Sequence, residues 1–359
     1  MDLVYKEDWE RARRRIDAWW QGEVLDRACI KVTAPRHPVK EEPAPSPAEL
    51  WSYWLDPGRV IPRLSAHLEA TYWGGEAFPV MFPMSTGIPC ILAAYMGCRV
   101  KFVNLFTGWQ DPCLLDWRDR KPLRFDPSND MWQRTEQLFR AAGENAQGRY
   151  YIGLPDLNGP GEAIARLRGP ERLAIDLLEN PDRVKQAVTE STALWLEYYN
   201  AGMKVIHEYV DGWHYWMGIW SDRPSTDLQC DFSCMISPAM FQEFFLPGIE
   251  RQTQWIGRTV YHLDGPGAIR HLDALLALPK LTGIQWVPGA GAPRMGQWIP
   301  LLKKIQSAGK RLFITFDKSE LALLLRELRP EGLLMQTHCD TVEEVETVIK
   351  TVEKSSTRR

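Results

Sequence analysis

From about residue 150 onward, apolar and polar positions alternate in a regular pattern. Short apolar runs, which predict buried strands, are separated by longer segments whose apolar residues recur at helical spacing. The runs occupy residues 150–155, 211–219, 229–236, 259–264, 281–287, 311–316 and 332–337. The helical segments occupy residues 170–207, 238–256, 267–278, 297–309 and 318–328. This alternation predicts an α/β fold with a parallel sheet, and about eight such units predict closure into a (β/α)8 TIM barrel.

An open, doubly wound sheet is the alternative arrangement of the same units. That fold often carries a G-x-G-x-x-G turn after its first strand or a phosphate-binding loop, and this chain shows neither. We therefore expect the barrel.

The N-terminal part of the chain has a different pattern. Residues 7–20 carry apolar residues at helical spacing and predict an amphipathic helix, and residues 29–34 (CIKVTA) predict a strand. We expect residues 1–75 to form a helical extension with this first strand, packed on a barrel of residues 76–350 that carries loop insertions. Residues 351–359 form a polar tail, and we expect its final residues, KSSTRR, to be frayed.

The composition is that of an ordinary globular protein, with 45% apolar and 25% charged residues. A net charge of −3 gives no basic surface for nucleic acid. The chain lacks an uncharged apolar stretch of about 18 residues, which argues against a membrane span. Its N-terminus is charged, without the apolar segment of a signal peptide, so we expect a cytoplasmic protein. Seven cysteines without a C-x-x-C pair predict free thiols.

Polar residues at the ends of the predicted strands are the candidates for chemistry, because barrel enzymes place catalytic groups there. His262 and Asp264 are the most informative pair, since residues i and i+2 of a strand point to the same side. Both could bind one metal ion at the barrel mouth. The thiolate of Cys339, after the last strand, would be a third ligand and leave one position open, as in catalytic zinc sites. Alternatively, His262 and Asp264 form a hydrogen-bonded pair that supports a loop, and Cys339 is a small buried apolar residue.

Two aspartates, Asp156 and Asp231, are candidates for direct catalytic roles because each lies in or just after a predicted strand. Asp231 could instead cap or brace the loop before a helix that opens at Ser237 and Pro238, a favourable N-cap and first-turn pair. Two carboxylates about 5–9 Å apart at a tryptophan-lined barrel mouth would indicate a glycoside hydrolase.

Sixteen tryptophans are the most unusual feature of the composition. Several fall near predicted strand ends, where a flat indole can form the wall of a pocket. We expect Trp216 and Trp286 to face the substrate, together with Gln285 and His214. An aromatic wall favours a sugar face, an aryl ring or a quaternary ammonium group. Packing in the core is the alternative for these indoles.

Two passages resemble the uroporphyrinogen decarboxylase superfamily. Residues 155–184 (PDLNGPGEAIARLRGPERLAIDLLENPDRV) and residues 231–252 (DFSCMISPAMFQEFFLPGIERQ) are similar to its conserved passages in content and order. The likeness spans roughly residues 75–350 and implies a TIM barrel with its site at the strand ends. True decarboxylases of the superfamily carry an arginine-rich N-terminal motif, which is missing from DRACIKVTAPRHP in this chain. A metal-free lyase of that kind is therefore the alternative rather than the leading hypothesis.

The motif order is most similar to the corrinoid-linked methyltransferase branch, which holds zinc through an H-x-C motif and a later cysteine. By this resemblance His262 and Cys339 are zinc ligands, and Asp264 replaces the middle cysteine, which makes the site richer in oxygen. The resemblance implies a zinc-dependent methyltransferase or demethylase acting between a small O- or N-methylated substrate and a corrinoid. The chain has no D-x-H-x-x-G corrinoid-binding motif, so a separate partner protein would carry the corrinoid.

In this hypothesis zinc polarises the heteroatom that carries the methyl group, and Asp231 or Asp156 orients the substrate or supplies a proton. The partners are then a small methyl donor or acceptor and the corrinoid protein, without nucleic acid or membrane. The chain could also form a homodimer. A small-molecule binding protein without catalytic activity is the non-enzymatic alternative.

Overall fold

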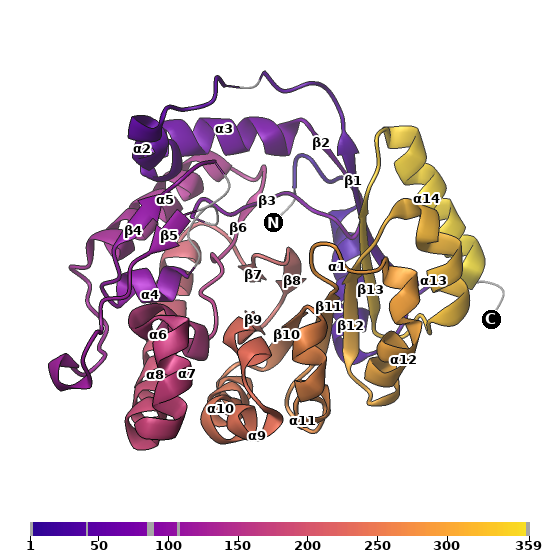
Figure 1. Ribbon diagram of the computed structural model, residues 1–359. Helices are drawn as coiled ribbons and strands as arrows, with labels where there is room; N and C mark the ends of the chain where they lie inside the picture. The colour runs from indigo at the N-terminus through magenta and orange to yellow at the C-terminus, as the bar shows by residue number, and fades with distance from the viewer. Residues whose placement is uncertain (1–2, 41, 85–89, 106–107, 357–359) are drawn as a thin grey trace.

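A computed structural model describes residues 3–40, 42–84, 90–105 and 108–356. The strands are short, and seven of them form one sheet (Figure 1). The strands are β1 Cys29–Pro35, β2 Thr71–Gly75, β3 Val80–Met81, β4 Val100–Phe102, β5 Gly108–Gln110, β6 Tyr151–Ile152, β7 Trp213–Tyr215, β8 Ile219–Ser221, β9 Ser225–Leu228, β10 Arg258–Asp264, β11 Gly283–Val287, β12 Arg311–Thr315 and β13 Leu333–His338.

Helices occupy much of the remaining chain. They are α1 Trp9–Gln21, α2 Leu50–Leu55, α3 Pro57–Glu69, α4 Ile91–Tyr95, α5 Asp130–Ala146, α6 Pro160–Arg168, α7 Pro170–Glu179, α8 Pro181–Ile206, α9 Pro238–Met240, α10 Leu246–Trp255, α11 Leu272–Leu276, α12 Ile299–Ser307, α13 Leu321–Glu327 and α14 Val342–Ser356. Within the described ranges, none of these helices combines the length and the apolar character needed to traverse a lipid bilayer.

The main sheet has the strand order β2-β1-β13-β12-β11-β10-β9. Its neighbouring strands run parallel, except that β2 is antiparallel to β1. The expected α/β fold with a parallel sheet is therefore confirmed. Closure into an eight-stranded barrel is not confirmed, because the strand pairings of the described residues do not run round a complete ring.

The interruption of the ring lies between β2 and β9. The two strands β3 and β6 are only two residues long and pair with each other apart from the main sheet. One isolated parallel bridge, between Leu154 and Tyr215, links the chain after β6 to β7. Strand β7 then pairs antiparallel with β8, which immediately follows it, instead of joining β9. Short strands and a local hairpin thus replace continuous parallel pairing on this side.

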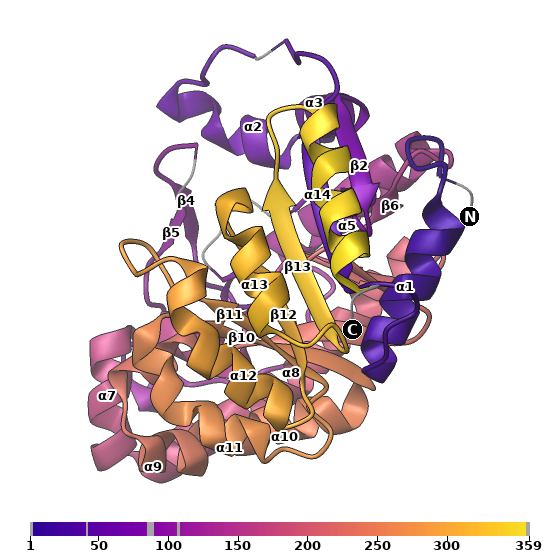
Figure 2. The ribbon, with the colours of Figure 1, turned by 90° about the vertical axis from the view of Figure 1, so that its right-hand side faces the viewer.

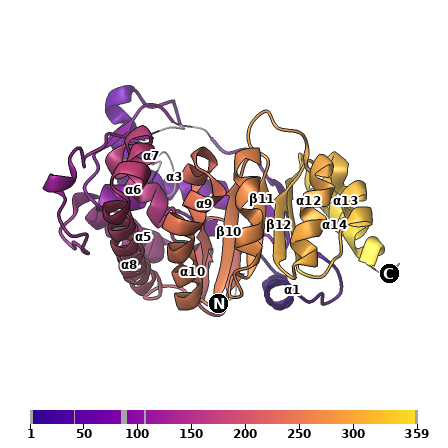
Figure 3. The ribbon, with the colours of Figure 1, turned by 60° about the horizontal axis from the view of Figure 1, so that its bottom comes forward.

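The helices that follow β10 to β13 cover the outer face of the sheet. Figure 2 shows α13 and α14 in front of β12 and β13, and Figure 3 shows α12 in the same outer layer. Leu263, Trp286 and Ile314 are fully buried on this side. Because side chains alternate along a strand, the preceding residues on β10 and β11, His262 and Gln285, point to the opposite, inner face of the sheet.

The N-terminal segment is built into the sheet. Residues 1–75 supply β1 and β2 as well as α1, so the extension and the sheet share one core. Arg27 donates hydrogen bonds of 2.8 and 2.9 Å to the fully buried carboxylate of Glu76, and Arg15 of α1 approaches the same carboxylate at 3.4 Å. The indole N–H of Trp20 donates to the carbonyl oxygen of Trp220 at 2.9 Å. These contacts attach α1 to the strands.

The C-terminal segment is more ordered than its polar composition indicates. Helix α14 extends through residue 356, so most of the tail expected at residues 351–359 is helical, and residues 357–359 lie outside the described ranges. Val345 and Val352, two turns apart on one side of this helix, are fully buried. The apolar stripe therefore holds the polar end of the chain in a helix.

Candidate metal centre

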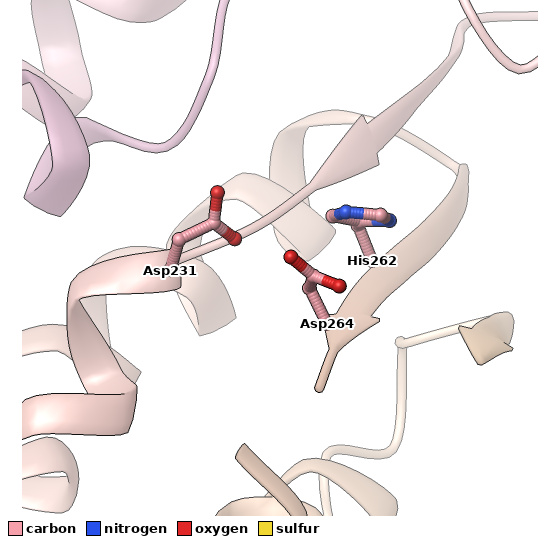
Figure 4. A group of neighbouring side chains, drawn as sticks. All are labelled: Asp231, His262 and Asp264. Carbon is pink, nitrogen blue, oxygen red and sulfur yellow. The ribbon is translucent and has the colours of Figure 1, made fainter. Parts of the chain in front are cut away.

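Three side chains meet at the C-terminal end of β10. His262 and Asp264 project from the same side of this strand, as their spacing predicts, and Asp231 opens the 3-10 helix η3 (Asp231–Met235) that follows β9 (Figure 4). A possible ligand atom of each residue lies within 4.8 Å of those of the other two. Asp231 does not cap the next helix, because the hydroxyl of Ser237 accepts the N–H of Met240 there. One imidazole and two carboxylates are thus placed where they could share a cation.

The imidazole of His262 is held by its neighbours. Its Nδ1 donates a hydrogen bond of 2.6 Å to Oε1 of Gln285, since an amide oxygen can only accept. The proton is therefore on Nδ1, and Nε2 is the nitrogen that can bind a cation. Trp216 packs edge-on against the ring, with 5.3 Å between the ring centroids.

The electrostatics of the three residues favour a positive ion. Burial raises the pKa of Asp231 above its ordinary value; His262 lowers this pKa, and the Asp264 carboxylate raises it. Two crowded carboxylates repel each other, and a bound divalent cation would relieve that repulsion. The arrangement can therefore hold a metal ion through one nitrogen and two oxygens.

A second pair of carboxyl groups, Asp156 and Asp227, lies beside the metal centre. Gln229 donates hydrogen bonds of 3.0 and 3.1 Å to the two carboxylate oxygens of Asp156, and the backbone N–H of Asn158 donates at 2.7 Å. Burial, reinforced by Asp227, raises the pKa of Asp156 to about 8, and burial raises that of Asp227 to about 6. The pair therefore holds at least one proton at neutral pH.

A cavity of about 310 Å³, here called the inner cavity, lies on the inner face of the sheet, one side chain away from His262. Trp216 and Gln285 line it, and both also contact His262. The aromatic side chains of its lining are Trp73, Phe78, Phe82, Trp216 and Phe313. Small-molecule sites start at about 300 Å³, so this volume suits a ligand about the size of one substituted ring.

Cys339 does not join the metal centre, contrary to the prediction. The residue before it, His338, points to the inner face, where its Nδ1 lies 3.1 Å from the hydroxyl of Thr33. Cys339 therefore points to the outer side and is fully buried. Strands β11 and β12 also separate β13 from β10, which is about 14 Å at the ordinary spacing of strands. Asp231 takes the place predicted for the thiolate.

Trp286 and His214 were predicted to face the substrate, and the structure places both in the core. Trp286 follows Gln285 directly, so it points to the outer face, where its ring centroid lies 5.0 Å from that of Trp298. His214 is 1% exposed and stacks on Tyr151 with 4.3 Å between ring centroids. Burial lowers the pKa of His214 to about 3 and keeps its imidazole neutral.

Three residues of this region were missed by the sequence analysis: Asp227, Gln229 and Lys31. Each is a polar or charged residue within a short strand or directly at its end. The signal that could have found them is a buried polar side chain in line with the inward positions of neighbouring strands. That signal needs the register between strands, which the sequence alone does not contain.

Comparison with known proteins gives a similarity of fold. Neither a protein-family model nor a curated protein sequence matches the chain. The structure is similar to that of a methyltransferase from Methanosarcina mazei, with a TM-score of 0.61 and 14% sequence identity. The similarity covers 96% of this chain and 98% of that chain. It shows that the two chains share an overall fold.

Proposed function

We propose that this protein is a metal-dependent methyltransferase, which moves a methyl group between a small O- or N-methylated molecule and a corrinoid carried by a separate protein. The observation that carries the proposal is the convergence of Asp231, His262 and Asp264 within 4.8 Å, beside the inner cavity. The fold shared with a methyltransferase from Methanosarcina mazei supports the same class of activity. The sequence passages that resemble the corrinoid-linked methyltransferases support it independently.

The three side chains fit zinc. Catalytic zinc sites commonly have three protein ligands, drawn from histidine, carboxylates and cysteine, and keep one position for water or substrate. The hydrogen bond from His262 to Gln285 is the kind of support that metal-binding imidazoles have. Zinc bound there would act as a Lewis acid toward the heteroatom that carries the methyl group. Two carboxylate ligands favour an oxygen or nitrogen donor over a thiol.

The residues around the centre would bind the substrate and move one proton. When the methyl group leaves, its bond to the heteroatom breaks, the heteroatom keeps the electron pair, and the methyl group passes to the corrinoid. The heteroatom then takes a proton. Asp156 is the donor that we expect, because its pKa of about 8 keeps it protonated at neutral pH. Trp216 and Gln285 would hold the substrate body against His262 from the inner cavity.

The metal content of the purified protein tests the first half of the proposal. We expect about one zinc ion per chain in the wild type and its loss in His262→Ala and Asp264→Asn, with unchanged far-ultraviolet circular dichroism. Cys339→Ala is the matched control, because this buried thiol points away from the centre, and it should keep the metal. A wild type that binds no zinc on titration, or a zinc ion lost only in Cys339→Ala, would contradict the site.

Methyl transfer itself is tested with free reduced cobalamin in place of the corrinoid protein. A panel of O-methyl and N-methyl compounds serves as donors, and methylcobalamin is followed by its absorption spectrum. We expect activity in the zinc-loaded wild type and a loss of about 10²- to 10⁴-fold in Asp156→Asn, which removes the proton donor. Stoichiometric zinc without transfer from any donor of the panel would count against a methyltransferase.

A further inference from the structure

Lys31 of β1 is the charged side chain of the inner cavity. The other lining side chains that the structure describes are aromatic, aliphatic, hydroxyl or amide groups. The Nζ of Lys31 donates a hydrogen bond of 2.6 Å to the carbonyl oxygen of Met217 and lies 5.3 Å from the centroid of the Phe313 ring. An ammonium group carries three N–H donors, and the contact with Met217 uses one of them.

The surroundings of Lys31 leave its charge uncompensated. Burial lowers its pKa to about 7, and no carboxylate among the described residues raises this pKa again. A buried ammonium group is costly unless an anion and further hydrogen bonds accompany it. The contacts that it does make, with a carbonyl oxygen and the face of an aromatic ring, offer partial rather than full negative charge. An anionic group of a ligand would supply what is missing.

The inner cavity extends from Lys31 to two side chains that contact His262. Lys31 is in register with Gln336 of β13, which is in register with Thr315 of β12, and all three line the cavity. On another side the lining includes Gln285 and Trp216, the two residues that contact His262. A ligand that fills the cavity would thus touch Lys31 and also the side chains that hold the imidazole.

We propose that the substrate carries an anionic group, such as a carboxylate, on a flat ring-bearing body, and that Lys31 binds this group while the methylated heteroatom faces His262. This inference deepens the proposed function and rests on it for the role of the ligand as substrate. The aromatic rings of Phe78, Trp216 and Phe313 would pack on the body of the ligand. Lys31 then determines specificity and takes no part in the chemical step.

Ligand binding to the full-length protein tests the inference separately from catalysis. The probes are 4-methoxybenzoate and 4-(methylamino)benzoate, each compared with its neutral carboxamide, and affinity is measured by calorimetry and tryptophan fluorescence. We expect the wild type to bind each carboxylate at least about 10-fold more tightly than its amide, the value of one charge-assisted hydrogen bond. Lys31→Met should lower carboxylate affinity by about 10- to 100-fold and leave amide affinity within about 3-fold.

Two further variants separate charge from shape. Lys31→Arg keeps a positive charge and should keep the preference for the carboxylate. Gln336→Leu removes a polar group from the same cavity without a change of charge, and should affect the carboxylate and the amide equally. Equal affinity of the wild type for carboxylate and amide, no binding of either pair, or a preference that survives in Lys31→Met would overturn the inference.

These outcomes are distinct from a failure of the proposed function. The comparison of carboxylate with amide in the wild type needs neither a metal ion nor a variant that must fold. A protein that prefers the carboxylates but binds no zinc and transfers no methyl group would keep the anion site and lose the methyltransferase. A zinc-loaded protein that transfers methyl groups without preferring the carboxylates would keep the methyltransferase and lose the anion site.

Discussion

At the scale of single residues, the candidate metal centre depends on the proton position of one imidazole. Gln285 accepts the hydrogen of Nδ1 of His262 at 2.6 Å, which leaves Nε2 for a cation. A rigid acceptor behind a metal-binding imidazole also orients the ring and makes its nitrogen a stronger ligand. Gln285 therefore acts on the metal through His262 as a positioning residue.

Replacement of Gln285 should change the affinity for zinc. Gln285→Leu is expected to weaken zinc binding by about 10- to 100-fold, because the imidazole loses its orienting hydrogen bond. Gln285→Glu keeps an acceptor oxygen and should retain the affinity. Competition with a chromophoric chelator measures the dissociation constants. Gln336→Leu, in the same cavity but two strands from Gln285, is the control. A similar loss of zinc there would mean that a disturbed cavity, and not the missing acceptor, weakens binding.

His214 should make the protein less stable in mild acid. Its pKa is about 3 in the folded state and about 6.5 in an unfolded chain, so only the unfolded chain binds the proton between these values. The neutral imidazole contributes fully to the free energy of unfolding above about pH 6.5. Between about pH 6.5 and pH 3, this contribution falls by about 1.4 kcal/mol for each unit of decreasing pH.

The replacement His214→Phe keeps a ring beside Tyr151 and removes the titrating group. Urea unfolding at pH 7, 6 and 5 measures the free energy of unfolding. This free energy should fall less steeply with decreasing pH in the variant than in the wild type, and the difference in slope should correspond to the uptake of about one proton. Parallel curves for the two proteins would show that the imidazole is protonated without unfolding.

At the scale of elements, the alternation of side chains along a strand explains most of what the sequence could predict. The apolar runs at residues 259–264, 281–287, 311–316 and 332–337 match β10 to β13 within two residues. The i, i+2 spacing was enough to place His262 and Asp264 on one side, because that rule is local to a single strand.

One failure is local, because the run at residues 229–236 contains the 3-10 helix η3 and the strand β9 lies just before it. The failures at the site come from relations between strands. Cys339 was grouped with His262 although it points outward and follows a strand three places away in the sheet. Asp231 reaches the centre because η3 turns beside the end of β10, and Lys31 reaches the inner cavity because β1 pairs with β13. Strand order and register decide these contacts, and residues distant in sequence determine both.

The attachment of helix α1 gives a prediction at this scale. Glu76→Gln should lower the free energy of unfolding by about 3–5 kcal/mol, because the buried Arg27 would lose its counter-charge, whereas Arg15 keeps its ion pair with Asp26. Chemical denaturation followed by circular dichroism measures the change. Glu23→Gln, at an exposed position after the same helix, is the control and should change stability by less than about 0.5 kcal/mol. A small effect of Glu76→Gln would mean that the arginines find other partners or water.

At the scale of the whole molecule, the metal centre and the inner cavity collect residues from β1, the β7–β8 turn and β10 to β13. These ligands and lining groups are together only in the folded chain. Binding to them therefore stabilises the fold as a whole, and does so in proportion to the logarithm of the ligand concentration.

Zinc should raise the thermal stability of the wild type accordingly. At a free concentration about 100 times the dissociation constant, the free energy of unfolding should increase by about 2.7 kcal/mol. Differential scanning calorimetry at increasing zinc concentrations measures the effect on Tm. His262→Ala should show no shift at the same concentrations, and a shift of equal size in that variant would place the bound zinc elsewhere.

The pairing of β1 with β13 also has a consequence for synthesis. Thr33 and His338, hydrogen-bonded neighbours in the sheet, are 305 positions apart in the chain. During synthesis, β1 leaves the ribosome long before β13 has been made. Until then, the apolar residues of β1 are exposed to solvent or bound by chaperones. A nascent chain that ends before residue 333 lacks β13. It therefore also lacks Gln336, which is in register with Lys31 in the folded sheet. Emergence of β13 from the ribosome is then the event that completes the ligand site.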